Sequence, residues 1–284
     1  MVQTICICGS GTMGSGIAQT AAQHGLNTIL FDVQPAALEK ARAGIEKNLQ
    51  HLADKQKLTD ADRQQILGRI RYASSISECR ADVIIEAIIE KLSAKTNLLN
   101  QLAEVNGEHT ILATNTSSLS VTDIAQAVLR PERVIGMHFF NPATIMKLVE
   151  VVQTTYTNEQ TTTQIVALAR RMGKTPVLCK DAPGFIVNHV ARPYYLESLK
   201  LVEMGIADYE TVDRLLEATG FKMGPFRLMD LIGNDINYAV SCQVYEALGK
   251  PERLQPSPLQ KEKVDAGALG RKTGNGYYVY PAKQ

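Results

Sequence analysis

The sequence lacks an excess of charge of either sign and lacks any long hydrophobic run. Its 284 residues include 30 Lys and Arg against 29 Asp and Glu, which gives a formal net charge of +1. A chain so close to neutral has no overall field that would draw it to nucleic acid or to a membrane surface. Charged or polar residues interrupt every apolar run well before the roughly 18 residues that a transmembrane helix needs. Neither a nucleic-acid-binding nor a membrane-spanning role has support.

Cysteines are also few, and their spacing is typical of neither a metal site nor a disulfide framework. The five are Cys6, Cys8, Cys79, Cys179 and Cys242. Cys6 and Cys8 lie in an apolar, strand-like run, and no other Cys or His falls at metal-ligand spacing. The opening residues, MVQTICICGSG, lack the basic start and the small-residue cleavage site of a signal peptide. We therefore expect a cytoplasmic protein with free thiols and no metal.

The first forty residues contain a pattern that is typical of dinucleotide-binding folds. The apolar run 4–8 is followed by GSGTMG, by a helical pattern that stops at Gly25, and by a second apolar run that ends at Asp32. A strand, a glycine turn, a helix, a strand and an acid in this order form one βαβ unit. A glycine turn with a purely structural role is the alternative. The predicted cofactor residues of this unit are Gly9, Gly11, Thr12, Met13, Gly14 and Asp32.

Each of these residue types suits a different part of a dinucleotide. Gly9 permits the tight turn, Gly11 lets the backbone approach a pyrophosphate, and Gly14 lets the helix pack closely on the strand. The helix N-terminus offers its dipole and unpaired amides to the phosphates. Asp32 would accept hydrogen bonds from a ribose diol and would repel a 2′-phosphate, so NAD is favoured over NADP.

The next stretch predicts a helical hairpin followed by further strands of the same sheet. Pro35 opens a helix that runs to about residue 57, and a second begins at Thr59–Asp60, in a region rich in Lys and Arg. The pattern looks like an insertion rather than a regular crossover. Most of these charges belong to a solvated helix face, although a subset could hold an anionic handle of the substrate.

Polar loops follow the two apolar runs 82–86 and 110–113, with a helical segment between them. The carboxyl ends of strands line the cofactor crevice of an open parallel sheet. Glu90, Lys95 and Ser117 therefore lie where they could contact the nicotinamide ribose or the substrate. Each could equally be a plain helix cap.

The segment 134–152 contains the residue pair with the clearest catalytic chemistry. His138 ends one apolar run, Asn141–Pro142 forms a turn, and Glu150 lies inside a second apolar run. An ionised carboxylate among valines is costly unless it is paired, and His138 is its obvious partner if the two strands fold back on each other. A carboxylate that holds an imidazole selects its tautomer, as a general base requires. The alternatives are a core ion pair and a glutamate at an exposed edge.

The composition changes near Asp181–Pro183, which divides the chain into predicted domains 1–182 and 183–284. The first reads as α/β, a doubly wound sheet with the helical hairpin. The second reads as helical, with amphipathic patterns at about 185–204, 208–218, 228–249 and 258–267, and a strand-like run only at 276–280. Its apolar faces and tyrosines could cap the cleft and bury against a second subunit.

In this fixed order, the segments GSGTMG, EAIIEKLSAK, NTSSLS, GMHFFNP, KLVEVV, DAPGFIVN and GRKTGNGYYVY resemble those of the 3-hydroxyacyl-CoA dehydrogenases, closest to the compact bacterial 3-hydroxybutyryl-CoA type. The resemblance covers essentially the whole chain. It implies reversible, NAD-dependent oxidation of a 3-hydroxyacyl-CoA in fatty-acid or related acyl-CoA metabolism. It also implies a homodimer that forms through the helical second domain.

The resemblance further implies a role for individual residues. His138 would be the catalytic base and Glu150 its orienting partner, while Ser117 and Asn188 would bind the 3-oxygen of the substrate. Residues implied to contact NAD beyond the glycine unit are Glu90, Lys95, Ser117, Asn141 and Lys272. Asn48 and Lys55 would contact coenzyme A, although Asn48 stands where some relatives have Ser.

Two other classes of function stay open from the residues alone. One is an NAD-dependent dehydrogenase of a 3-hydroxyacid that carries no CoA. The other is a non-catalytic NAD-binding protein of the same fold, which we would expect to lack one of the residues His138, Glu150 and Asn188.

Overall fold

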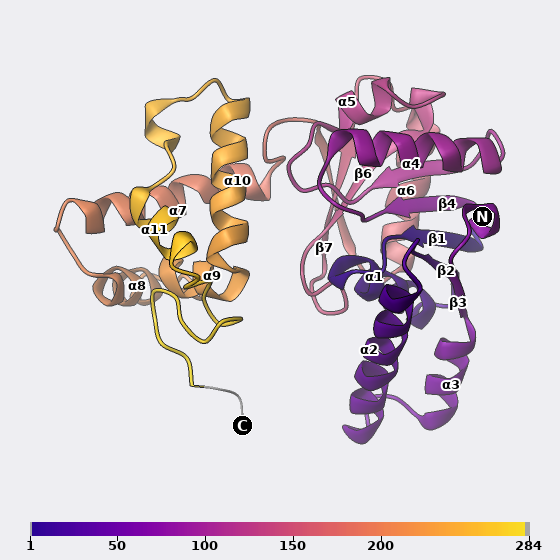
Figure 1. Ribbon diagram of the computed structural model, residues 1–284, viewed down its shortest axis with the longest axis horizontal. Coiled ribbons are helices and arrows are strands. Elements are labelled where there is room, and N and C mark those ends of the chain that lie inside the picture. The colour runs from indigo at the N-terminus through magenta and orange to yellow at the C-terminus, as the bar shows by residue number, and fades with distance from the viewer. Residues whose placement is uncertain (1, 282–284) are drawn as a thin grey trace. The chain divides into compact units, whose positions relative to one another are not determined.

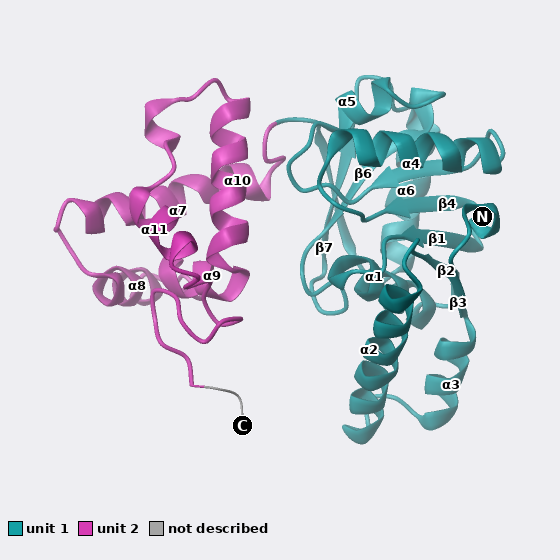
Figure 2. Cartoon of the chain, viewed as in Figure 1, with its two compact units in different colours: residues 1–182 teal, residues 183–284 magenta. Residues whose placement is uncertain are grey.

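The computed structural model describes residues 2–281 and divides the chain into two compact units. Unit 1 is Met1–Ala182 and unit 2 is Pro183–Gln284 (Figure 2). Unit 1 has a sheet with helices on both of its faces, and the described part of unit 2 is helical (Figure 1). Within the described residues, no helix is both long and apolar enough to cross a membrane.

One sheet of eight strands organises unit 1, in the order β3-β2-β1-β4-β5-β6-β7-β8. Neighbouring strands from β3 to β6 are parallel, β7 is antiparallel to β6, and β8 is parallel to β7. The carboxyl ends of β1 to β6 therefore lie along the same edge of the sheet. The strands are β1 (Thr4–Cys8), β2 (Asn27–Phe31), β3 (Ile70–Ala73), β4 (Val83–Glu86), β5 (Ile111–Thr114), β6 (Val134–Phe139), β7 (Leu148–Gln153) and β8 (Thr175–Lys180).

Both faces of the sheet are buried, which explains why its strands read as continuous apolar runs. In β1, Ile5 and Ile7 join one core, which also takes side chains from α1 (Thr12–Gln23), α2 (Pro35–Asp54), α3 (Asp60–Gly68) and α6 (Glu159–Arg171). Cys6 and Cys8 alternate with them and join the core on the opposite face, together with α4 (Leu92–Val105) and α5 (Val121–Gln126). The three cysteines of this second core, the third being Cys79, are free thiols.

The predicted helical hairpin is present as α2 and α3, and the structure shows how it is connected. It links β2 to its parallel neighbour β3, so the hairpin itself is the crossover between these two strands (Figure 1). The sequence pattern did not reveal β3, because only its two end residues, Ile70 and Ala73, are buried. Thr59 caps α3 by accepting a hydrogen bond from the amide of Asp62 at 3.1 Å.

Unit 2 contains α7 (Val187–Glu203), α8 (Tyr209–Ala218), α9 (Pro225–Ile232), α10 (Asn234–Ala247) and α11 (Pro258–Asp265). Its core includes the rings of Tyr209, Phe226 and Tyr277, whose centroids lie 4.8 to 5.0 Å apart. Three short 3₁₀ helices complete the described elements of the chain, at Ile76–Glu78, Pro131–Arg133 and Glu252–Leu254.

Two expectations for unit 2 were wrong in detail. The single helix expected over about 228–249 is broken into α9 and α10 at Gly233, whose φ of +107° no helix accommodates. The strand-like run 276–280 makes only isolated bridges. Its amides at Tyr277 and Tyr278 donate instead to the buried carboxylate of Asp230, each at 3.0 Å, so a side chain replaces a neighbouring strand.

Candidate active site

The glycine turn after β1 is tightly packed at Gly9 and Gly14 and open at Gly11. Gly9 has a φ of +101°, and a Cβ there would lie 2.6 Å from the carbonyl oxygen of Ala87. A Cβ on Gly14 would lie 1.7 Å from the carbonyl oxygen of Gly9, so the close approach of helix and turn needs glycine. A Cβ on Gly11 would meet no heavy atom within 4 Å. The backbone of Gly11 therefore faces open space, where a phosphate can approach it.

The N-terminus of α1 supplies the electrostatic part of this site. All of α1 is described, and it begins after Gly11 with neither a side-chain cap nor an acidic residue in its first turn. Its partial positive charge is thus not neutralised locally, and the amides of Thr12 and Met13 lie in that turn. Helix N-termini of this kind bind phosphate groups.

Asp32, directly after β2, is held in place beside the glycine turn. Its Oδ2 accepts hydrogen bonds from the amide and the hydroxyl of Ser10, at 2.9 and 2.8 Å, and its Oδ1 accepts one from the amide of Gln34 at 3.0 Å. These donors fix the carboxylate where the dinucleotide fold places a ribose diol. Ser10 was not among the predicted site residues, although its place inside GSGTMG was a signal.

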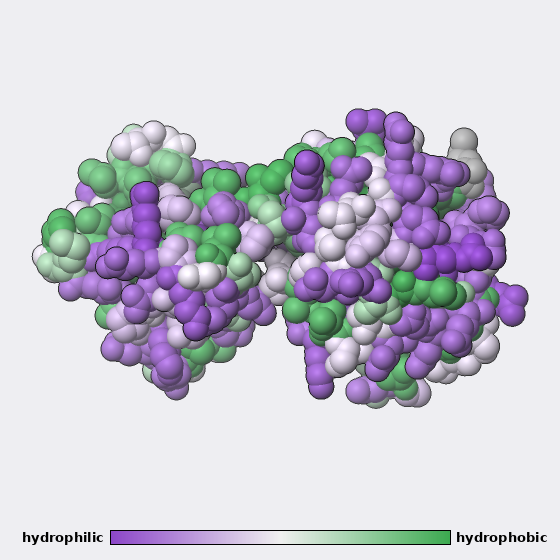
Figure 3. Space-filling view, turned by 90° about the horizontal axis from the view of Figure 1, so that it is seen from above, coloured by the Kyte–Doolittle hydropathy of each residue, from purple (hydrophilic) through white to green (hydrophobic). Residues whose placement is uncertain are grey.

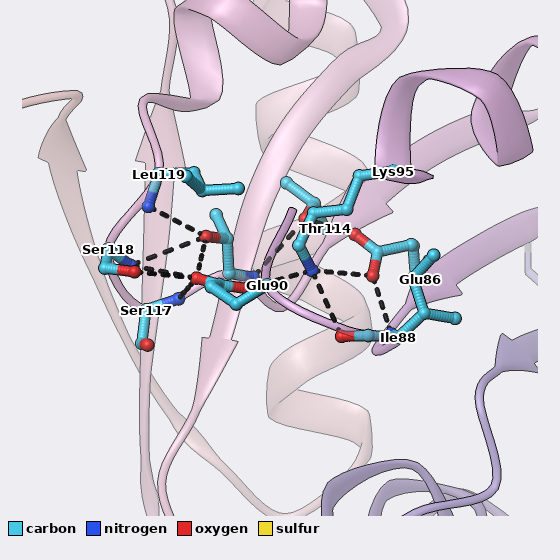
Figure 4. Close-up of polar contacts among 9 residues, drawn as sticks. Glu86, Ile88, Glu90, Lys95, Thr114, Ser117, Ser118 and Leu119 are labelled. Atoms are coloured by element: carbon cyan, nitrogen blue, oxygen red, sulfur yellow. Dashed lines mark hydrogen bonds and ion pairs between the residues drawn. The ribbon is translucent and has the colours of Figure 1, made fainter. Parts of the chain in front are cut away.

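Two carboxylates and an ammonium form a cluster at the ends of β4 and α4 (Figure 4). The Nζ of Lys95 lies 2.7 Å from Oε1 of Glu86 and 3.1 Å from Oε2 of Glu90. Lys95 is 1% exposed and Glu86 is fully buried. The structure thus brings the predicted residues Glu90 and Lys95 together and adds Glu86, which sequence reasoning passed over as the last residue of an apolar strand.

Glu90 in turn holds the turn after β5. Its Oε1 accepts hydrogen bonds from the amides of Ser117 and Ser118, at 3.0 and 3.2 Å, and from the hydroxyls of Thr116 and Ser118. Burial alone would raise the pKa of Glu90, but the Lys95 ammonium and the hydroxyl donors outweigh it and lower the pKa. Glu90 therefore stays ionised at neutral pH. The side chain of Ser117 points away from this carboxylate in Figure 4.

His138 and Glu150 meet across the antiparallel pair β6 and β7, as the sequence predicted. The two residues are register partners, and Nδ1 of His138 lies 2.8 Å from Oε2 of Glu150. His138 is 6% exposed and Glu150 is 1% exposed. The amide of Phe139 donates to Oδ1 of Asn115 at 2.8 Å, which ties the end of β6 to the end of β5. The pair thus lies at the same sheet edge as the glycine turn, Asp32 and Ser117.

The turn between β6 and β7 begins at the exposed Asn141. A buried lysine, Lys174, forms hydrogen bonds with its backbone. The Nζ of Lys174 donates to the carbonyl oxygens of Ala143 and of Met146, the latter at 2.9 Å. Thr20 in α1 also donates to the carbonyl oxygen of Ala143, at 3.3 Å. The turn that carries Asn141 is therefore bound to the helix that follows the glycine motif.

The predicted coenzyme A residues lie on the hairpin. Asn48 is exposed on α2, with its Nδ2 3.5 Å from Oε1 of Gln19, and Lys55 is the exposed C-cap of the same helix. The hairpin tip carries an open pocket of about 500 Å³ whose lining includes Asp54, Asp60, Asp62 and Lys57. With three acids and one lysine, the pocket itself is a poor site for an anion.

The remaining predicted residues belong to unit 2. Asn188 lies in the first turn of α7, and its carbonyl oxygen accepts a hydrogen bond from Nε of Arg192 at 3.0 Å. Lys272 donates to both carboxylate oxygens of Asp235, at 2.6 and 2.7 Å. A Cβ on Gly233 would lie 3.0 Å from Nζ of Lys272, so this ion pair uses the space that glycine leaves.

Comparison with known protein families identifies the family of this chain. Residues 4–182 match the NAD binding domain of 3-hydroxyacyl-CoA dehydrogenase, and residues 184–280 match the C-terminal domain of the same family. The chain belongs to the 3-hydroxyacyl-CoA dehydrogenase family. The cofactor of the family's N-terminal domain, NAD, fits the open backbone at Gly11 and the oriented carboxylate of Asp32.

Individual relatives agree with this assignment. The chain is 46% identical to 3-hydroxyadipyl-CoA dehydrogenase of Escherichia coli, an alignment that covers all of this chain and 60% of that protein's length. It is 41% identical to a probable 3-hydroxybutyryl-CoA dehydrogenase of Bacillus subtilis, over 99% of both chains. The crystal structure of (S)-3-hydroxybutyryl-CoA dehydrogenase from Ralstonia eutropha superposes with a TM-score of 0.94, at 39% identity, over 99% of this chain and 100% of that one.

Replacement of Asp32 tests the cofactor site directly. Asp32→Ala removes a charged acceptor for the ribose diol, and a hydrogen bond to a charged group is worth about 1.5–3 kcal/mol. We therefore expect NADH to bind about 10- to 100-fold more weakly, while NADPH affinity stays the same or rises because the repulsive charge is gone. Fluorescence titration with both reduced cofactors measures this. An unchanged preference for NADH over NADPH would show that Asp32 does not bind the ribose diol.

Proposed function

We propose that the protein catalyses the reversible, NAD-dependent oxidation of a 3-hydroxyacyl-CoA to the 3-oxoacyl-CoA, with substrates of the 3-hydroxybutyryl-CoA type. The observation that carries this proposal is the buried contact of 2.8 Å between His138 and Glu150. It lies at the sheet edge that also holds the glycine turn and Asp32. The names of the relatives support the substrate class.

NAD, when bound, supplies the hydride acceptor. Residues of the protein accept and return the proton of the 3-hydroxyl group. With the Nδ1 proton of His138 donated to Glu150, the neutral ring carries its lone pair on Nε2. In the oxidation direction Nε2 accepts the proton of the 3-hydroxyl group, and the Glu150 carboxylate stabilises the resulting imidazolium. In the reduction direction the protonated ring polarises the ketone and returns the proton.

Other predicted residues fit supporting roles within unit 1. Ser117 follows β5 in a turn whose amides are held by Glu90, and this ordered turn supports the assignment of its hydroxyl to the 3-oxygen of the substrate. Glu90 and Asn141 flank the same edge and are assigned to the nicotinamide half of NAD. The roles of Asn188 and Lys272, both in unit 2, stay predictions.

Substitution of the two central residues tests the mechanism. General-base assistance typically raises the rate about 10²- to 10⁴-fold. We therefore expect His138→Gln to lower kcat by at least about 10²-fold. Glu150→Gln keeps the shape of the side chain but removes the charge that stabilises the imidazolium, and we expect a smaller loss of kcat. NADH affinity, measured by fluorescence titration, should be nearly unchanged in both variants. A folded His138→Gln protein with near-normal kcat would exclude His138 as the base.

The coenzyme A handle separates the proposal from a dehydrogenase of free 3-hydroxyacids. Binding energy from the remote handle can be used at the reacting carbon, so kcat/KM should fall steeply when acetoacetyl-CoA is replaced by acetoacetate. Exposed ion pairs contribute about 0.2–1 kcal/mol, and Lys55→Ala should raise the KM for acetoacetyl-CoA by up to about fivefold with kcat unchanged. Lys57→Ala on the same hairpin is the matched control. Equal kcat/KM for acetoacetate and acetoacetyl-CoA would favour the free-acid function.

Unit 2 has the surface for self-association, and we include a homodimer in the proposal. Hydrophobic residues interrupt the hydrophilic surface of both units in Figure 3. Those exposed on unit 2 include Leu201, Met204, Ile206, Leu215, Phe221 and Ile236. Burial of such side chains against a partner would be favourable, and this is the support for the dimer.

Sedimentation velocity tests the dimer. We expect the wild type to sediment as two chains of 31.1 kDa, and a variant with Ile206→Asp and Leu215→Arg to sediment as one. Leu129→Arg, an equally exposed leucine of unit 1, should leave the dimer intact and serves as the control. A wild type that sediments as a monomer at micromolar concentration would contradict this part of the proposal.

The proposal also places the protein in the cytoplasm, in fatty-acid or related acyl-CoA metabolism. The support is the acyl-CoA chemistry of the relatives and the free thiols of the described cysteines. Recovery of the protein in a membrane or secreted fraction after cell fractionation would count against this location.

A further inference from the structure

The cluster at the end of β4 contains a residue to which neither the sequence pattern nor the mechanism assigns a role. Glu86 is fully buried, and its carboxylate accepts hydrogen bonds from Nζ of Lys95 at 2.7 Å, from the amide of Ile88 at 2.7 Å and from the hydroxyl of Thr114 at 2.6 Å (Figure 4). A buried carboxylate is expensive unless it is fully paired. Three donors, from β4's own loop, α4 and β5, therefore satisfy this buried carboxylate.

Lys95 differs from an ordinary surface lysine because it is buried and contacts two carboxylates. It lies in the first turns of α4, where the helix dipole disfavours a cation, and only 1% of its surface is exposed. Its ammonium contacts Glu86, Glu90 and the carbonyl oxygen of Ile88, the last at 3.5 Å. The side chain therefore joins the end of β4 to Glu90.

Glu90 completes a continuous path to the turn that carries Ser117. Its side chain is 31% exposed, and it receives the amides of Ser117 and Ser118 together with two hydroxyls. Each step of the path is a charge-assisted contact, and such contacts are stronger than those between neutral groups. Displacement of Lys95 would thus loosen Glu90 and, through it, the backbone at Ser117.

We propose that Glu86 and Lys95 are positioning residues, which act through Glu90 to hold the Ser117 turn in its reactive geometry. This inference rests on the proposed function, because Ser117 matters to turnover only if the edge of the sheet is the active site. Beyond the NAD contact that the resemblance implies for it, Lys95 then also acts through the Glu90 carboxylate that it orients.

Three variants of the full chain test the proposal: Glu86→Gln, Lys95→Met and the double variant. A misplacement of about 1 Å can cost about 10²-fold in rate, and we expect kcat to fall by about that factor in each, with the KM for acetoacetyl-CoA changing less than fivefold. Amide hydrogen exchange at residues 116–119 should accelerate about tenfold while the strands keep their protection. Lys95→Met leaves two carboxylates without their cation, so its Tm should fall most.

The double variant separates positioning from simple stabilisation. Replacement of both members of a buried ion pair by neutral side chains often restores stability, so its Tm should recover relative to Lys95→Met. Positioning predicts that kcat stays low and that the 116–119 exchange stays fast. Recovery of kcat together with Tm would overturn the proposal, and so would failure of all three variants to fold, since the cluster would then be a folding element.

Asp82→Asn is the matched control, because it removes an acid at the other end of the same strand. Asp82 directly precedes β4, and Glu86 is the last residue of β4. Asp82 accepts the amides of Gln3 and Thr4 at 2.7 and 2.9 Å, at the opposite end of the strand. This variant should lower Tm without changing kcat or the exchange at 116–119. A wild type that cannot reduce acetoacetyl-CoA would refute the proposed function, whereas an active wild type with an equally active Glu86→Gln would refute the positioning role alone.

Discussion

The cost of burying a carboxyl group without hydrogen-bond partners is the constraint on which both units of this molecule depend. Unit 1 buries Glu86 and Glu150, and unit 2 buries Asp213 and Asp230. Each of the four is paired with donors that come from a different element of the chain. Because an unpaired carboxyl group in the interior is costly, each of these acids holds together the elements that supply its partners.

The consequences differ between the two units. In unit 2 the carboxylate of Asp213 accepts the amides of Phe226 and Arg227 and the hydroxyl of Tyr278, and burial raises the pKa of this carboxyl in spite of these donors. Together with Asp230 it holds the segment 277–280 in place without a sheet. In unit 1 the partners are titratable side chains, His138 and Lys95, so the same constraint produces groups that can take part in chemistry.

Sheet topology determines where that chemistry occurs. The strands from β1 to β6 are parallel, so the residues that follow them lie at one edge. The glycine turn, Asp32, Glu90 and Ser117 reach that edge from four different loops. The reversal at β7 then returns the chain so that Glu150 lies opposite His138.

Some of this could be predicted from residue patterns, and the rest depended on contacts between distant segments. The glycine unit could be recognised because glycine spacing and short apolar runs are local properties of the sequence. The pairing of His138 with Glu150 followed from a turn at Asn141–Pro142 between two apolar runs. The strand β3 was missed because a four-residue edge strand buries too few side chains to leave a pattern. The break at Gly233 was missed because the helical periodicity continues on both sides of it.

The amino-acid sequence alone determined the family, the type of cofactor and the two residues of the proposed proton transfer. Each of these can be recognised from short motifs in a fixed order. The tertiary structure decided that Lys95 is buried between two carboxylates, that Glu86 is one of them, and that Glu90 holds the Ser117 turn. Glu86 precedes Lys95 by nine positions and Thr114 by twenty-eight, so its role arises only when β4, α4 and β5 pack together. The physical reason is that the ionisation and burial of a side chain depend on neighbours that only the fold brings together.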